Sequence, residues 1–325
     1  MTAIQPTRWG APAIITTATL WGTTGVAAVL IPQENPVAVG AASVGVGGII
    51  LGLISLKAVL KSFRTRGATR YILLGALGLM MYMPLFYVSV SLTGAALGTI
   101  ISIGSGPLFA GLLEWVVDGK RVTITWTAAM LVTVAGAGIL LAAREDHGTG
   151  DAAGLVPGIV AGLVAGITYA LYAFATGRLI QPCANRPEGM AHRTVVAAIQ
   201  GTAALPMLGL LAFTGENTFT TPVWAVLLYL AVIPTALGHT LFAFGLGRMK
   251  ASTATLYTVL EPVVATVLAV LIIGEAFRPE GWFGFPLVIA GLVLVNVAPT
   301  KRRPKPASAE TALPAGQPAG TRAAS

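Results

Sequence analysis

The sequence has little charge and almost no cysteine, and both shortages restrict the class of protein. Charged residues make up 10% of its 325 residues and hydrophobic residues 55%, whereas soluble domains carry roughly 25% charged residues. A water-soluble chain of this composition could not cover its surface with polar side chains, so we predict an integral membrane protein. The single cysteine, Cys183, excludes an internal disulfide and a metal site built from cysteines.

Motifs for catalysis and for nucleotide binding are also missing. The three histidines, His147, His192 and His239, are scattered along the chain, and neither an HExxH metal motif nor a GxxxxGK[ST] phosphate-binding loop is present. A channel would need a filter of carbonyls or a ring of charges, and neither is evident. We therefore expect no metal and no cofactor, and a membrane-embedded enzyme is the least favoured function.

Long apolar runs are what the sequence contains instead. Ten runs of about twenty residues are each long enough to cross a bilayer as an α-helix. They lack the strict alternation over about ten residues that a transmembrane β-barrel requires. The ten predicted spans are residues 11–31, 37–60, 69–91, 95–117, 122–142, 154–178, 194–213, 222–246, 251–273 and 280–298.

The loops between these spans carry basic residues on one side. If the N-terminus is cytoplasmic, all but two of the 20 basic residues, Arg144 and Arg278, fall in cytoplasmic segments. Lys and Arg accumulate in cytoplasmic loops, so we predict a multi-pass inner (plasma) membrane protein with both termini cytoplasmic. The same distribution argues against a nucleic-acid partner. Residues 1–10 are then a cytoplasmic N-terminus, and 299–325 are expected to be a disordered basic cytoplasmic tail.

The two halves of the chain resemble each other. SGPLFAGLLEWVVDGKRV (105–122) aligns without a gap on LEPVVATVLAVLIIGEAF (260–277), which places Pro107 on Pro262 and Gly119 on Gly274. Each half holds five spans, an odd number, so the second half enters the membrane from the opposite face. We predict an all-α integral membrane fold of ten transmembrane helices as two inverted-topology five-helix repeats, 11–142 and 154–298, joined by an external linker at 143–153.

Three segments resemble the EamA-type ten-helix transporters of the drug/metabolite transporter superfamily: ATLWGTTG (18–25), LYTVLEPVVATVLAVLIIGEAF (256–277) and its weaker copy ISIGSGPLFAGLLEWVVDGKRV (101–122). The similarity covers most of residues 10–298. It implies transport of a small metabolite such as an amino acid, with export favoured by the resemblance alone. The first half has Gly106 where the second has Glu261, so any chemistry of that carboxylate is one-sided.

Glu261 is the strongest candidate for a functional residue, because it lies in the middle of the apolar span 251–273. A charge at a helix centre costs at least about 2.5 kcal/mol on insertion scales, so it is expected to face a partner or a water-filled cavity. There it could bind a proton reversibly or hold a substrate ammonium. The structural alternative is a hydrogen bond to backbone left open by a bent helix.

Pro107 and Pro262 remove amide donors and kink helices, at matching places in the two halves. They are therefore candidates for a bent helix pair that lines a shared cavity, with plain packing as the alternative. His239 could relay protons or contact substrate, or it could simply be satisfied by a neighbouring helix. Glu114, near the end of the 95–117 span, is expected at the membrane interface.

Five aromatic residues are candidates to line a substrate cavity, although interface anchoring and packing explain most membrane aromatics: Trp21, Tyr82, Tyr87, Tyr169 and Tyr257. Together these features predict a permease that moves a small polar, amino-acid-like metabolite by alternating access, with protons as a further partner to test. The alternative is a facilitative uniporter of another metabolite or drug without proton coupling. A monomer is expected, with a dimer as the alternative.

Overall fold

The computed structural model describes residues 9–31, 34–119, 121–143, 152–182, 189–215, 219–274 and 277–297. The expected linker at 143–153 and the tail at 299–325 lie wholly or largely outside these ranges. Within them no β-strand occurs, and eight helical segments are long and apolar enough to cross a membrane, so the all-helical membrane class is confirmed. The eight segments are Pro36–Ile54, Ala68–Thr93, Leu97–Asp118, Ile124–Ala142, Gly154–Ile180, His192–Phe213, Thr221–Leu246 and Ala251–Ile273.

Two of the ten predicted spans fall outside these eight. The run at 11–31 forms a 20-residue helix whose five threonines lower its hydropathy, and the run at 280–298 forms a shorter apolar helix. The number of membrane crossings therefore stays a prediction. The predicted span 37–60 was too long, because the helix is interrupted at Ser55 and continues as a short amphipathic segment carrying Lys61 and Arg64.

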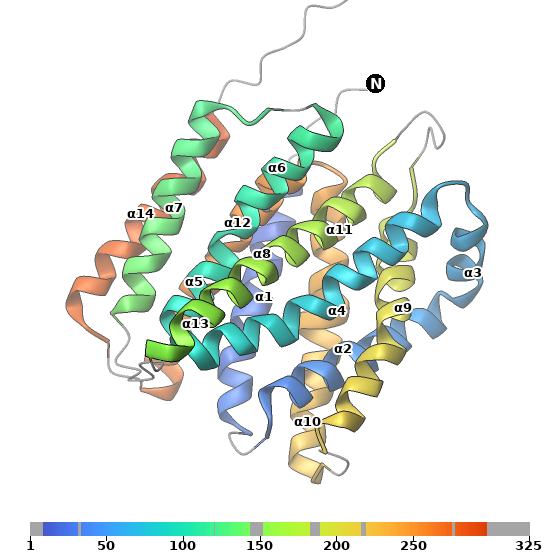
Figure 1. Ribbon diagram of the computed structural model, residues 1–325, viewed down its shortest axis with the longest axis horizontal. Helices are drawn as coiled ribbons and strands as arrows, with labels where there is room; N and C mark the ends of the chain where they lie inside the picture. Colours follow the sequence, from blue (N-terminus) through green and yellow to red (C-terminus); the bar gives the residue numbers. More distant parts are fainter. Residues whose placement is uncertain are drawn as a thin grey trace, which may run out of the picture.

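Several of the transmembrane rods are interrupted rather than continuous (Figure 1). In chain order the elements are α1 (Gly10–Val29), α2 (Pro36–Ile54), α3 (Leu56–Arg64), α4 (Ala68–Thr93), α5 (Ala95–Gly104), α6 (Gly106–Asp118), α7 (Ile124–Ala142), α8 (Ala152–Ile180), α9 (His192–Phe213), α10 (Thr221–Leu230), the π-helix η1 (Ala231–Gly238), α11 (His239–Leu246), α12 (Ala251–Thr258), α13 (Leu260–Leu268), the π-helix η2 (Ala269–Ile273), the 3₁₀-helix η3 (Pro279–Phe283) and α14 (Gly284–Val297). Thus α5 and α6 form one rod, α10, η1 and α11 a second, and α12, α13 and η2 a third.

Capping residues and glycines set the ends of these helices. The side chains of Asn35 and Thr123 accept hydrogen bonds from backbone amides in the first turns of α2 and α7. Gly119 (φ 65°) and Gly274 (φ 74°) terminate α6 and η2 in the left-handed conformation that other residues adopt only with strain. Both glycines fall where the sequence repeat aligns them.

The two halves of the chain are interleaved. The four most extensive helix pairs are α4 with α8, α2 with α9, α7 with α14 and α1 with α13, and each joins a helix of the first half to one that begins at residue 152 or later. The pairing of α6 with α12 also joins the two halves. In Figure 1, α7 and α14 lie side by side at one end of the bundle, and α2, α9 and α10 lie at the other. Small residues let these backbones approach closely.

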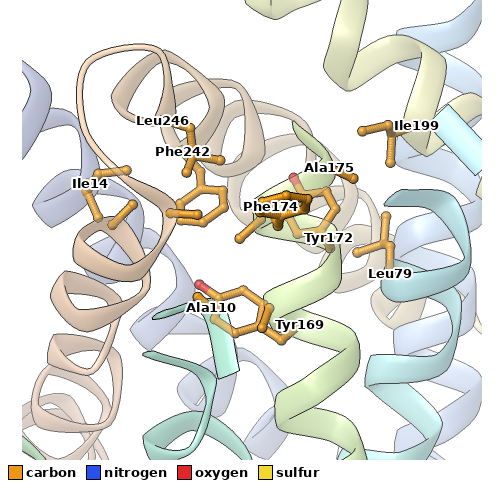
Figure 2. Packing of buried hydrophobic residues seen from close by; sticks show 14 of the residues in the cluster. Ile14, Leu79, Ala110, Tyr169, Tyr172, Phe174, Ala175, Ile199, Phe242 and Leu246 are labelled. Atoms are coloured by element: carbon orange, nitrogen blue, oxygen red, sulfur yellow. The ribbon is translucent and has the colours of Figure 1, made fainter. Parts of the chain in front are cut away.

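The buried core lies between these helices, and apolar side chains also cover the outside. Figure 2 shows Tyr169 and Tyr172 of α8 and Phe242 of α11 directed into the space between their helices. On the outer surface, Phe213 is 91% exposed and Leu271 75% exposed. Such exposure is costly in water but favourable against lipid, as expected of a membrane protein.

Candidate functional site

Aromatic rings from four helices meet at one level of the bundle. The Trp21 ring of α1 lies 5.0 Å from the His239 ring and 5.4 Å from the Phe242 ring of α11, and 6.3 Å from the Tyr169 ring of α8. Tyr82 of α4 lies 5.4 Å from Tyr169. We call Trp21, Tyr82, Tyr169, His239 and Phe242 the ring cluster.

Further rings extend the ring cluster along α4 and α8. Phe86 links Tyr82 to Tyr87, with centroid distances of 5.9 and 5.4 Å. Tyr172 stacks on Phe242 at 6.0 Å. The structure therefore brings together Trp21, Tyr82, Tyr87, Tyr169 and His239 from the residues predicted by sequence. Tyr257 is buried in the main hydrophobic core on α12.

The π-helix η1 orients Trp21 and His239. Pro234 lies inside this segment and has no amide to donate, and the π-helical register leaves carbonyls for side chains to use. Trp21 Nε1 donates to the Pro234 carbonyl at 3.0 Å, and His239 Nδ1 donates to the Thr235 carbonyl at 2.8 Å. Thr17 donates to the Gly238 carbonyl at 3.1 Å. One nitrogen of His239 is thus bonded to a carbonyl four residues earlier on its own rod, whereas the structural alternative expected a partner on a neighbouring helix.

Glu261 lies in the first turn of α13, in the middle of the rod 251–273. The residue is partly buried, and it lies one turn after Thr258, whose hydroxyl is 2.8 Å from the Tyr169 hydroxyl. Among the described residues no hydrogen bond or ion pair reaches its carboxylate. The structural alternative, a bond from Glu261 to open backbone, is therefore not observed in the described part of the chain. Gly22 of α1 packs against the backbone of Glu261 and the side chain of Val264.

A hydrogen bond ties the ring cluster to the same rod. The Tyr169 hydroxyl and Thr258 Oγ1 are 2.8 Å apart, and both groups are buried. Thr258 is the last residue of α12, immediately before the break at Val259 that separates α12 from α13. The break thus lies next to both the ring cluster and Glu261.

The two candidate prolines occupy matching breaks. Pro107 follows the interruption at Ser105 between α5 and α6, and Pro262 follows the interruption at Val259. Both prolines are in the first turn of the helix that continues the rod, where a missing amide costs least. Both are buried, and α6 packs against α12, the segment just before Pro262.

Glu114, which the sequence predicts at the membrane interface, is buried between helices of the two halves. It is 5% exposed, its Oε2 accepts from Ser252 Oγ at 2.6 Å, and its Oε1 accepts from the Ser252 amide at 3.4 Å. The carboxylate therefore caps the start of α12 from α6. Four residues further on, Asp118 pairs with Arg178 of α8 at 2.8 Å. We call these two interactions the latch.

A cavity of about 450 Å³ lies at the other end of the rod 251–273. Its walls come from α1, from α10 and from the end of the rod: Thr23, Val26, Ala27, Leu30, Ala225, Val226, Tyr229, Leu268 and Ile272. The Thr23 and Tyr229 hydroxyls, 2.7 Å apart, form its polar contact. Leu268 is two turns beyond Glu261 on the same helix face, so the cavity wall continues the face that carries Glu261.

Three features of this region were not predicted from the sequence: Phe242, the Glu114–Ser252 contact and the π-helix η1. Phe242 could have been found, because it lies one turn after His239 and so shares its helix face. The Glu114–Ser252 contact joins residues 138 positions apart, and no local pattern marks it. The π-helix η1 is indicated only by Pro234 inside an apolar run. Among the described residues no three His, Cys, Asp or Glu side chains are grouped as a metal site.

The fold and the site define a multi-pass helical membrane protein with a carboxylate and an aromatic cluster enclosed between its helices. Comparison with known sequences identifies the class as a transporter. The model of the EamA-like transporter family matches residues 8–142 and again residues 156–297, and the chain belongs to this family.

Individual relatives agree with this assignment. The chain is 32% identical to an uncharacterized transporter, YwfM, of Bacillus subtilis strain 168, over 89% of this chain and 94% of that protein. It is 27% identical to a probable terminal-alkyne amino-acid exporter of Streptantibioticus cattleyicolor, over 82% and 89% of the two chains. A protein of known crystal structure shares the fold with a TM-score of 0.70 at 20% identity, covering 88% of this chain and 96% of the other.

Proposed function

We propose that this chain is a secondary transporter of the inner membrane that moves a small polar, amino-acid-like metabolite by alternating access, in the export direction. The observation that carries the proposal is the arrangement along the rod 251–273. Ser252 of the latch is at its start, Glu261 beside the ring cluster is at its middle, and Ile272 of the cavity is at its end. A carrier that is closed at the latch end and open at the cavity end has this arrangement of contacts along the rod.

The contacts between the halves support a pair of inverted repeats. A Cβ added at Gly136 of α7 would lie 2.7 Å from the Gly284 carbonyl, and one added at Gly291 of α14 would lie 2.7 Å from the Ala129 carbonyl. The sequence repeat aligns Gly136 with Gly291 and Ala129 with Gly284. Each of the two contacts therefore corresponds to the other when one half is aligned on the other half. Two related halves can open alternately to the two sides of a membrane around a site at their interface.

Other helix pairs follow the same exchange. The contact of α4 with α8 has its counterpart in the contact of the α10–η1–α11 rod with α1, and the contact of α1 with α13 has its counterpart in that of α8 with α5 and α6. These pairings fit ten membrane crossings with five in each half. The basic loops then mark the latch end as cytoplasmic, with both termini on that side.

Glu261 has two roles in this account. Its carboxylate holds an ammonium group of the substrate, and it can take up a proton when the substrate leaves. The partly exposed, unpaired state of its side chain among the described residues supports both roles. The amino-acid exporter among the relatives supports a metabolite substrate and the export direction, although its identity to this chain is only 27%.

The test uses purified protein in vesicles loaded with a mixed metabolite pool. Efflux is followed by mass spectrometry, with and without a pH gradient, for wild type, Glu261→Gln and the control Glu280→Gln, which changes an exposed carboxylate on η3. We expect a compound to leave through wild type and Glu280→Gln, driven by the gradient, and to be retained with Glu261→Gln. Equal efflux from all three proteins that ignores pH would instead indicate a facilitative uniporter, and no efflux of any compound from wild type would contradict transport of this substrate class.

A further inference from the structure

The charge balance at Glu261 restricts the substrate more narrowly than the family does. Described Lys and Arg residues lie towards the ends of the helices, and none contacts Glu261. The nearest cation along α8, Arg178, is nine residues or roughly 14 Å beyond Tyr169 and is paired with Asp118. Arg248, after α11, lies over the Phe244 ring and donates to the Phe244 carbonyl. The site thus holds one carboxyl group without a described Lys or Arg beside it.

The surrounding rings favour a cation. Trp21, Tyr82 and Tyr87 are only partly buried. Aromatic faces attract ammonium groups through their quadrupole, and desolvation strengthens this attraction. Glu261 lies one turn after Thr258, which is bonded to Tyr169, and the Tyr169 ring is 5.4 Å from the Tyr82 ring. An ammonium group placed among these rings would be stabilised by the carboxylate and by the aromatic faces together.

Four of the hydrogen-bond donors around the rings are already engaged by the protein. Trp21 Nε1 and His239 Nδ1 donate to carbonyls of η1, Thr17 donates to carbonyls of α1 and η1, and the Tyr169 hydroxyl is bonded to Thr258. A substrate carboxylate would therefore find these donors occupied. It would also lie near Glu261, whose charge repels it.

We propose that this site selects an amine cation with an apolar or aromatic body and discriminates against the corresponding α-amino acid, whose carboxylate finds no counter-charge. The inference rests on the proposed transport function for its biological meaning. Within the amino-acid-like metabolites proposed above, it restricts the substrate to amines that lack the α-carboxylate. Binding and transport are measured separately, so that each can fail without the other.

Binding is tested by isothermal titration calorimetry on the full chain in lipid nanodiscs. The probes are tyramine and tyrosine, which share the ring and the amine and differ by the carboxylate. Wild type is compared with Glu261→Gln, with Tyr82→Leu, which removes one ring but keeps apolar volume, and with the control Glu280→Gln. The folded state of each variant is checked by its melting temperature, and Tyr82→Leu provides the test if Glu261→Gln does not fold.

We expect tyramine to bind wild type and Glu280→Gln at least about tenfold more tightly than tyrosine does, and both site variants to weaken tyramine binding. The proposal is overturned if tyrosine binds as tightly as tyramine, if both site variants bind tyramine like wild type, or if neither compound binds at millimolar concentration. Efflux of another compound from the loaded vesicles would still support the transport function in each of these cases.

Discussion

The Glu114–Ser252 contact of the latch, which joins α6 to α12, offers a quantitative prediction. Glu114 is buried, and the short contact from Ser252 Oγ to its carboxylate joins two helices from different halves of the chain. Replacing Ser252 by alanine removes this donor and leaves a buried carboxylate with a weaker bond to the Ser252 amide. A hydrogen bond to a charged group contributes about 1.5–3 kcal/mol. If the bond is lost when this end opens, its removal raises the open population roughly 10- to 150-fold.

The assay is the accessibility of a reporter cysteine behind the latch. Ala110 is fully buried on α6, one turn before Glu114 on the same face. Because Cys183 is the single cysteine of the chain, Ala110→Cys in a Cys183→Ser background gives one labelling site. A membrane-impermeant maleimide is added from the face that carries the basic loops. We expect Ser252→Ala to raise the labelling rate by the factor given above.

The control for this experiment is Ser62→Ala. Ser62 is also buried, but its hydroxyl donates to the Val59 carbonyl within the same helix and joins no other helix. Its removal should leave the labelling rate of Ala110→Cys unchanged. An unchanged rate in Ser252→Ala, or an equal rise in Ser62→Ala, would refute the assignment of Glu114 and Ser252 to the closure of this end.

Two further substitutions test the ring cluster and the contact between halves. Trp21→Phe keeps an aromatic ring but loses the 3.0 Å bond to the Pro234 carbonyl. A neutral hydrogen bond contributes about 0.5–1.5 kcal/mol, so we expect a lower melting temperature and slower efflux. Unchanged values of both would show that the bond does not position the ring. Gly291→Val places side-chain atoms against the Ala129 backbone and should cost about 1–3 kcal/mol or more, seen as loss of monodisperse protein in size-exclusion chromatography. Gly25→Ala, with open space around the added carbon, is its control, and equal behaviour of both variants would contradict the close approach of α7 and α14.

Composition and spacing predicted the class of the fold because the bilayer imposes long apolar helices. The repeat around Pro107 and Pro262 also predicted matching breaks, since a proline at the same aligned position disturbs the helix in both halves. Trp21 and Tyr169, both predicted from the sequence as candidates to line a substrate cavity, lie 6.3 Å apart in the structure. All members of the ring cluster except Phe242 were thus predicted as candidates from the sequence, and their functional roles are proposals.

Long-range contacts and shifts of helical register were not accessible from sequence. Glu114 was expected at the interface because it is close to Trp115 and Asp118, and its partner Ser252 is supplied only by the packing of α6 on α12. The break at Ser55 lies inside a run that is apolar enough to read as one helix. The carbonyls of η1 accept from Trp21 and His239, and no local sequence pattern predicts these contacts.

The central claim is that the face of α13 carrying Glu261 is reached from each side of the membrane in turn. The most direct measurement is the labelling of Ala265→Cys, one turn beyond Glu261, in the Cys183→Ser background. An impermeant maleimide is added from either face of sealed vesicles, with wild-type Ser252 and with Ser252→Ala. We predict labelling from both faces, with the rate from the basic-loop face raised by Ser252→Ala and the rate from the opposite face lowered. Labelling from one face alone in both backgrounds would contradict alternating access.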